Sequence, residues 1–146
     1  ETAYAGILKT SPDIGMYTSV ETGDCSIRNA FAANDAVSFG SIINAYTQPF
    51  LLLYNHRKDR GYRMEAFANA IRQSTAKPVC IGVIGEHKKA CAQYMQRATG
   101  IRAQAVERPK EWIQAQNVRH VLCAGNIKGE GRQFLEEMIE EARQNV

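Results

Sequence analysis

Three short runs of apolar residues are the clearest feature of the chain. They cover residues 49–54 (PFLLLY), 78–84 (PVCIGVI) and 120–124 (HVLCA), and a polar residue precedes each of them. Apolar runs of this length, without alternation, are typical of strands that are buried on both faces of a parallel sheet. We therefore expect three interior strands.

A helical pattern follows each of these runs. Apolar residues recur three and four positions apart, which is the spacing of one face of an α-helix. Strand, turn and amphipathic helix in repetition are characteristic of crossover units. The predicted fold is therefore α/β, with a Rossmann-like, mostly parallel sheet flanked by helices. The three apolar faces comprise Met64, Phe67, Ala68 and Ile71; Ala90, Cys91, Tyr94, Met95 and Ala98; and Phe134, Leu135, Met138, Ile139 and Ala142.

Weaker patterns predict the remaining elements. Residues 27–33 and 101–106 are strand candidates, and residues 16–20 are expected to form a hairpin with the first of them. A helix is expected over residues 39–46. Another helix is expected to begin at Pro109, because proline fits the first position of a helix.

The length of 146 residues suits one domain with its own hydrophobic core. The helical pattern of residues 4–9 is stopped by the turn that contains Pro12. We expect residues 1–12 to be the end of a preceding domain or a hinge, and residues 13–146 to form the α/β domain. The chain lacks an initiator methionine, so a piece of a longer protein or a processed product is expected.

Composition excludes several classes of protein. Hydrophobic residues make up 45% of the chain and charged residues 23%, which is ordinary globular usage. The net charge of +3 comes from 18 basic and 15 acidic residues, so we expect no nucleic acid as a partner. No apolar run approaches the roughly 20 residues of a membrane-spanning helix. The four cysteines form no CxxC pair, which favours reduced thiols and a cytoplasmic location.

Candidate ligand sites lie where the predicted strands lead into helices. In an open α/β sheet, ligands bind beyond the carboxyl ends of the strands, and helix N-termini at that edge attract anions. Four segments occupy such positions: residues 29–38, 55–63, 85–89 and 125–132.

Two of these segments carry cations that suit an anionic ligand. Arg57, Arg60 and Arg63 follow the first apolar run, and Lys128 lies in a glycine-containing turn after the third. Guanidinium groups bind carboxylates and phosphates through paired, charge-assisted hydrogen bonds. A solvated loop with internal salt bridges is the alternative. Residues 87–89 (HKK) are expected to be a solvated helix start.

The first segment offers amide and carboxylate groups. Asn29 lies near a strand end, where its carboxamide could bond a ribose or a base. Asn34 or Asp35 is a good N-cap for the following helix. A structural role for these residues as caps and strand-end amides is the alternative.

Two further observations bear on activity. The phosphate-binding pattern G-x-x-x-x-G-K-[ST] does not occur in the chain, so we expect it not to hold the phosphates of ATP alone. Cys25 follows Gly23 and Asp24 and faintly resembles the nucleophile of some cysteine proteases. That chemistry would require a histidine beside Cys25 at a helix start.

Four ordered motifs carry a family resemblance. They are LKTSPDIGM at residues 8–16, NAFAAND at 29–35, NHRKDR at 55–60 and AGNIKG at 124–129. Together they resemble the C-terminal domain of Mur ligases, and within that superfamily the poly-γ-glutamate synthase branch. The resemblance extends along almost the whole chain.

The resemblance implies an ATP-dependent acid–amino-acid ligase that forms ADP. In this family ATP phosphorylates a carboxylate, and an amine displaces the phosphate to form an amide. In this branch the carboxylate is the γ-carboxylate of a poly-γ-glutamate chain, and the amine belongs to another glutamate. The family's central domain carries the phosphate loop and the Mg²⁺ site. A cytoplasmic enzyme held at the membrane by other subunits of a capsule polymer synthase is implied.

The family's contacts map onto residues of this sequence. Asn29, Asn34 and Asp35 would contact the nucleotide, with Asn29 where many Mur ligases have an acidic residue. No catalytic residue or metal ligand is assigned. Two alternatives stay open, namely another Mur-type amino-acid ligase and a non-catalytic Rossmann-like interaction module. The expected substrate-binding residues are Arg57, Arg60, Arg63 and Lys128.

Overall fold

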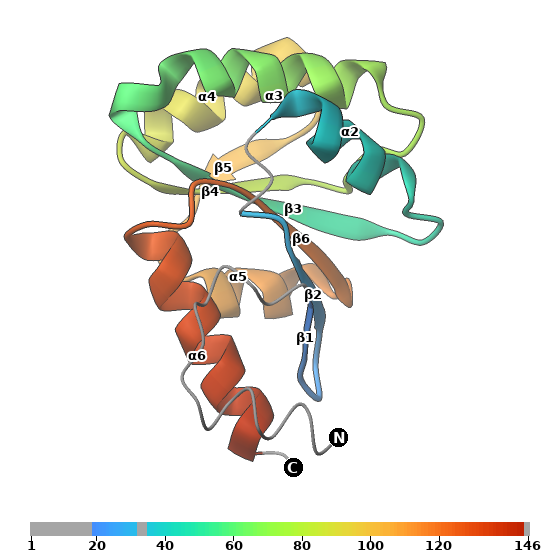
Figure 1. The fold of residues 1–146 in the computed structure, drawn as a ribbon, viewed down its shortest axis with the longest axis vertical. Coiled ribbons are helices and arrows are strands. Elements are labelled where there is room, and N and C mark those ends of the chain that lie inside the picture. The colour runs from blue at the N-terminus through green and yellow to red at the C-terminus, as the bar shows by residue number, and fades with distance from the viewer. Residues whose placement is uncertain (1–18, 32–34, 145–146) are drawn as a thin grey trace.

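A computed structural model describes residues 19–31 and 35–144, apart from the side chain of Arg60. In this part of the chain, six strands form one sheet in the order β1-β2-β6-β3-β4-β5 (Figure 1). The prediction of an α/β fold is confirmed. The strands are β1 (Ser19–Glu21), β2 (Ser26–Asn29), β3 (Phe50–His56), β4 (Ile81–Gly85), β5 (Ala103–Ala105) and β6 (His120–Gly125).

The sheet is parallel except at one edge. β1 pairs antiparallel with β2, and every other neighbouring pair is parallel. β3 lies in the centre, where Leu52 is paired with Leu122 of β6 on one side and with Ile81 of β4 on the other. All seven residues of β3 are buried, as expected for a strand with helices over both faces.

Helices cover both faces of the sheet. α2, α3 and α4 lie over one face, and α5 and α6 lie over the other (Figure 1). Each face has its own cluster of buried apolar side chains, so the sheet separates two cores. The helices are α2 (Ala36–Asn44), the short 3₁₀ turn η2 (Lys58–Arg60), α3 (Gly61–Gln73), α4 (Lys88–Thr99), α5 (Pro109–Gln116) and α6 (Glu130–Gln144).

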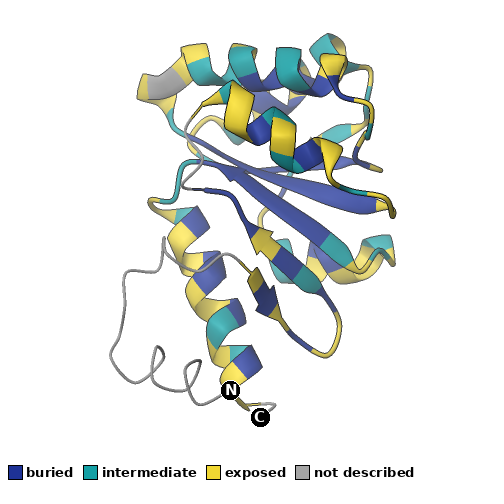
Figure 2. Ribbon diagram, turned by 45° about the vertical axis from the view of Figure 1, so that its right-hand side comes forward, coloured by how far each residue is buried: buried dark blue, intermediate teal, exposed yellow. Residues whose placement is uncertain are grey.

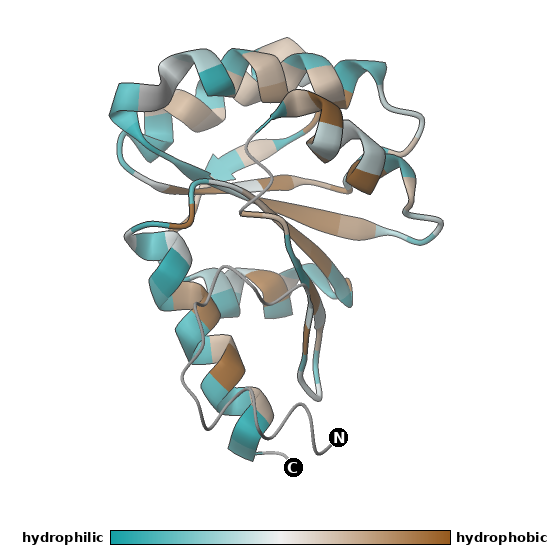
Figure 3. Ribbon diagram, in the orientation of Figure 1, coloured by the Kyte–Doolittle hydropathy of each residue, from teal (hydrophilic) through white to brown (hydrophobic). Residues whose placement is uncertain are grey.

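The hydrophobic pattern of the sequence explains this arrangement. The strands β3, β4 and β6 are almost entirely buried, and the helices turn exposed residues outward (Figure 2). The same strands carry the most hydrophobic residues, whereas the helices alternate between hydrophobic and hydrophilic positions (Figure 3). In α6, Phe134, Leu135, Met138 and Ala142 are buried on one stripe. No helix in the described ranges has the length and apolar character needed to cross a bilayer.

The predicted strands differ from the observed ones mainly at their ends. The strand expected over residues 27–33 is β2, which ends at Asn29 because the chain turns at Phe31. The strand expected over 101–106 is shorter, at Ala103–Ala105. In α4 the buried stripe includes Ala92, whereas Ala90 is exposed. The expectations for residues 1–12 and for the helix over 4–9 concern residues outside the described ranges.

Candidate functional site

The connections between strands indicate a ligand site at the carboxyl ends of β3 and β6. β3 and β6 are neighbours, yet α3, which follows β3, packs on one face and α6, which follows β6, packs on the other. The turns after these strands therefore diverge at the left-hand side of Figure 1, and the crevice between them is the cavity that residues of both turns line. Ligands of open α/β sheets bind at such switch points.

A cavity of about 350 Å³ lies at this crevice. Arg57, after β3, and Lys128, after β6, both line it, although 71 positions separate them in the sequence. The structure thus brings together two of the cations singled out from the sequence. The full lining consists of Asn55, His56, Arg57, Gly85, Glu86, Lys128, Gly129 and Glu130.

Asn55 holds the turn after β6 in place. Its side chain is 2% exposed, and Nδ2 donates to the backbone oxygens of Asn126 at 2.5 Å and Lys128 at 2.7 Å. The chain passes close to this amide, since a Cβ on Gly131 would lie 2.5 Å from Nδ2. Sequence reasoning placed Asn55 in a loop and missed this role.

A second set of hydrogen bonds joins the ends of β3 and β4. The His56 ring donates from Nδ1 to the backbone oxygen of Glu86 at 2.8 Å, since a carbonyl can only accept. The backbone nitrogen of Glu86 donates to the oxygen of His56 at 2.9 Å. The Glu86 carboxylate accepts from the backbone nitrogen of Lys58 at 3.0 Å. Three strand ends are therefore fixed around the cavity.

The two cations of the cavity differ in their partners. Arg57 forms an ion pair with Asp59 at 3.1 Å, and the two side chains are 28% and 53% exposed. An exposed pair of this kind contributes at most about 1 kcal/mol, so a ligand carboxylate can compete for the guanidinium. Lys128 is exposed, and its ammonium has no ion-pair partner among the described residues.

The sequence predicted a solvated helix start at residues 87–89, but the side chain of Lys88 is largely buried and paired. Its side chain is 17% exposed, and Nζ lies 3.1 Å from a Glu130 carboxylate oxygen and 3.2 Å from one of Glu107. Burial is the largest influence on the pKa of Lys88 and lowers it. The hydrogen bonds and charges of Glu130 and Glu107 together outweigh burial and raise the pKa. The neighbouring His87 and Lys89 are exposed, as expected.

The remaining basic candidates lie apart from the cavity lining. Arg63 is half-buried on α3 and is not among the residues that line the cavity. It lies near enough to Tyr54 for its charge to act on the pKa of that phenol, which burial raises. Arg60 belongs to η2, and its side chain lies outside the described part of the structure.

The nucleotide candidates occupy the connection from β2 to α2. Asn29 is 8% exposed, and its Oδ1 accepts from the backbone nitrogen of Phe31 at 3.1 Å. Asp35 caps α2, because Oδ1 accepts from the backbone nitrogen of Ser38 at 2.7 Å and Oδ2 from its hydroxyl at 2.9 Å. These bonds from Ser38 lower the pKa of Asp35. Asn34 lies outside the described residues.

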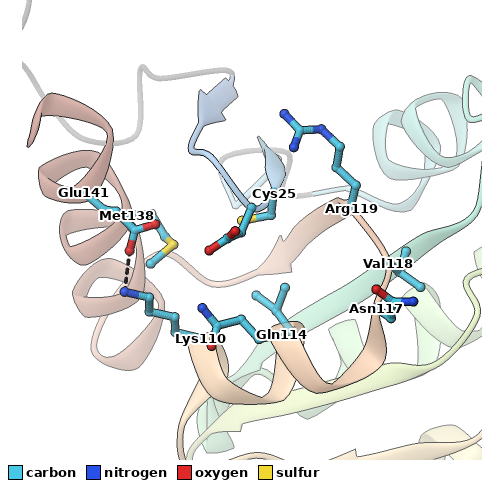
Figure 4. Close-up of a pocket in the computed structure, with 10 residues that line it drawn as sticks. Cys25, Lys110, Gln114, Asn117, Val118, Arg119, Met138 and Glu141 are labelled. Carbon is cyan, nitrogen blue, oxygen red and sulfur yellow. Dashed lines mark ion pairs between the residues drawn. The ribbon is translucent and has the colours of Figure 1, made fainter. Parts of the chain in front are cut away.

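Cys25 lies just before β2, at the amino end of that strand and therefore on the side of the sheet away from the crevice. It lines a second cavity of about 360 Å³ between the β1–β2 hairpin, α5 and α6, where Lys110 is paired with Glu141 (Figure 4). Burial raises the pKa of the Cys25 thiol, whereas a nucleophilic cysteine needs a lowered pKa. No histidine is among the residues that line this cavity. The arrangement argues against a cysteine nucleophile.

Over residues 19–31 and 35–144, no group of three or more histidine, cysteine, aspartate or glutamate side chains is arranged to hold a metal ion.

Two solved structures with the same fold carry the names of a synthase and of a ligase. Folylpolyglutamate synthase from Thermotoga maritima matches 98% of this chain with a TM-score of 0.63 and 16% identity. A domain from a Haemophilus ducreyi protein assigned as a UDP-N-acetylmuramate:L-alanyl-γ-D-glutamyl-meso-diaminopimelate ligase matches 85% of this chain, with a TM-score of 0.54 and 12% identity. The chain therefore shares the fold of these two proteins.

Sequence comparison then gives the family. The family described as the poly-gamma-glutamate synthase CapB C-terminal domain matches residues 17–141. The chain belongs to this family, which confirms the resemblance found in its motifs. A comparison with curated protein sequences gives no significant match. The chain spans 36% of the length of the folylpolyglutamate synthase and 98% of the Haemophilus domain.

Proposed function

We propose that this chain is the C-terminal domain of an ATP-dependent ligase that forms γ-glutamyl amide bonds in the synthesis of a poly-γ-glutamate capsule. Support comes from the family match and from two fold neighbours whose names are those of a synthase and a ligase. The phosphate-loop pattern is absent from the sequence, so activity requires a further domain that supplies it.

One observation carries the proposed site. Arg57 and Lys128 line the same cavity, at the switch point between β3 and β6. A carboxylate of glutamate or of the growing chain would accept hydrogen bonds from the Arg57 guanidinium and be attracted by the Lys128 ammonium. Arg60 and Arg63 are proposed as flanking cations near the same anionic ligand.

This proposal assigns the residues of the chain three tasks. They bind the glutamate carboxylate, orient the incoming amine, and exclude water from the reacting groups when the two domains close. Bound ATP would supply the phosphoryl group that activates the accepting carboxylate. The family resemblance assigns Mg²⁺ to the domain with the phosphate loop.

The nucleotide contact is proposed for the connection after β2. Asn29 and Asp35 flank this connection, and Asn34 lies within it. Asn29 would hydrogen-bond a ribose hydroxyl through its carboxamide. A cytoplasmic enzyme that associates with membrane subunits of a polymer synthase completes the proposal.

The test uses the ligase as a complete protein, with the phosphate-loop domain present. We expect ADP release to depend on glutamate, and the double substitution Arg57→Ala with Lys128→Ala to raise KM for glutamate at least about tenfold. Arg97→Ala, an exposed residue of α4, serves as the control. Arg63→Ala, assayed alongside, measures its contribution separately. An unchanged KM in the double variant would remove the carboxylate site.

The same assay separates the alternatives. Parallel reactions with both enantiomers of glutamate and with other amino acids would identify a different Mur-type ligase. Calorimetry of the complete protein with ATP and glutamate oligomers would detect a non-catalytic module, because such a module should bind neither.

A further inference from the structure

Lys88 connects two helices that lie on opposite faces of the sheet. It is the first residue of α4, and Glu130, its closer carboxylate partner at 3.1 Å, is the first residue of α6. Glu107, at 3.2 Å, belongs to the connection from β5 to α5, and the Lys88 ammonium also lies 3.4 Å from the backbone oxygen of Val106. One ammonium therefore has acceptors from two separate connections around the carboxyl edge of the sheet.

The position of Lys88 is unfavourable for its own helix. A cation in the first turn of a helix faces the positive end of the helix dipole, where an anion is favoured. The lysine is also largely withdrawn from water, with 17% of its side chain exposed. Glu130, in contrast, lies at the end of α6 where the dipole favours a carboxylate. The stability of α4 therefore does not explain why a lysine occupies its first position.

Glu130 gives the pair a link to the proposed substrate site. It lines the same cavity as Arg57 and Lys128, and it directly follows the turn that Asn55 holds. An uncompensated carboxylate in this cavity would repel the carboxylate of glutamate and would compete for the two cations. Lys88 does not line the cavity, so it can neutralise Glu130 without contacting the ligand.

The charges around the cavity show what this neutralisation does. The lining residues contribute two positive charges, from Arg57 and Lys128, and two negative charges, from Glu86 and Glu130. With Lys88 bound to Glu130, one of the two negative charges of the lining is compensated from outside it. The raised pKa of Lys88 keeps its ammonium charged at neutral pH.

We propose that Lys88 is a positioning residue of the anion site: by pairing with Glu130 it fixes the start of α6 and cancels a carboxylate that would otherwise oppose substrate binding. The inference rests on the proposed function, because it assumes that the cavity binds a carboxylate of glutamate. It names a residue that acts through Glu130 and that does not touch the substrate.

The test is a set of charge substitutions at Lys88 and Glu130, made in the complete ligase. Lys88→Met should raise KM for glutamate by roughly three- to tenfold and leave kcat within about twofold, because one charge near a protein surface changes binding by this order. Lys88→Arg should restore KM, since a guanidinium can pair with the same carboxylates. Lys89→Met is the matched control and should leave KM unchanged, because Lys89 is the next residue of α4, is exposed and lies outside the cavity lining.

The decisive variant combines Lys88→Met with Glu130→Gln. If Lys88 acts by cancelling the charge of Glu130, the increase in KM caused by Lys88→Met should largely disappear in the double variant. Equal KM values for Lys88→Met and the wild type, or no recovery in the double variant, would overturn the inference. Thermal unfolding of each variant, followed by circular dichroism, would show whether a KM change comes from a general loss of folding.

Failure of this inference can be distinguished from failure of the proposed function. If Arg57→Ala with Lys128→Ala raises KM while Lys88→Met does not, the anion site stands and the role of Lys88 is wrong. If the arginine and lysine substitutions have no effect on KM, the site itself is wrong.

Discussion

The side chain of Asn55 donates a hydrogen bond to the backbone oxygen of Lys128 at 2.7 Å, across 73 positions of the sequence. A second bond from the same nitrogen reaches the backbone oxygen of Asn126. The end of β3 therefore determines where the turn after β6 lies, and with it the position of the Lys128 side chain. The buried amide therefore holds the backbone of Lys128 beside the strand end that leads to Arg57.

Asn55→Asp should destabilise the domain by about 2 kcal/mol or more, because it places a carboxylate against two carbonyl oxygens that have lost their donor. Urea denaturation would measure the change. Asn69→Ala, a partly exposed asparagine on α3, is the control and should stay within about 0.5 kcal/mol of the wild type. Equal unfolding midpoints for Asn55→Asp and the wild type would show that the amide does not hold the turn.

Gly82→Ala should destabilise the fold by about 1–3 kcal/mol, because overpacking forces neighbouring groups to shift. A Cβ at this position in β4 would lie 2.8 Å from a ring carbon of Trp112 on α5. Circular dichroism during denaturation would measure the loss. Gly40→Ala provides the contrast, since an added Cβ there meets nothing within 4 Å. In the helix α2 that change should stabilise by about 0.5–1 kcal/mol.

Asp35→Asn should change how stability depends on pH. The pKa of Asp35 is lowered by its hydrogen bonds to Ser38, so the stabilisation from its charge is complete above the pKa of the unfolded chain. That stabilisation is lost as pH falls through the lower pKa of the folded state. Asparagine keeps the cap but does not ionise.

The measurement for Asp35→Asn is the melting temperature across a pH series. The wild type should melt higher than the variant near neutral pH, and the difference should shrink below about pH 4. A constant difference over the whole series would contradict the assigned cause.

The four cysteines should react slowly with Ellman's reagent in the native protein. All four are buried, and burial raises the pKa of Cys91 to about 12 and also raises that of Cys25 and Cys123. Because the thiolate is the reactive form, both access and ionisation are limited. Full reaction is expected in denaturant, and Ser41→Cys, at an exposed position of α2, should add one fast thiol. Rapid native labelling of the original cysteines would contradict this.

The sequence was sufficient for the fold but not for the details of the site. Long apolar runs such as that of β3 indicate buried strands because both faces must exclude water, and this prediction is confirmed. The role of Asn55 could not be inferred, since it depends on how close β6 passes to β3. Lys88 was misinterpreted for the same reason, because its carboxylate partners are 19 and 42 positions away.

Strand ends were the least predictable elements. The apolar pattern continues beyond Asn29, yet β2 ends there and the chain turns at Phe31, whose backbone nitrogen bonds to the Asn29 side chain. A side chain that competes with the sheet for backbone hydrogen bonds is not visible in hydrophobic periodicity. Such competition also explains why the connection from β2 to α2 begins earlier than expected.

The contact between Trp112 and Gly82 has a practical consequence. Trp112 is the single tryptophan of the sequence and is 7% exposed, so its fluorescence reports on one known place, the packing of α5 against β4. Emission from the unlabelled protein can therefore show whether a substitution on the α2–α4 face loosens the opposite layer.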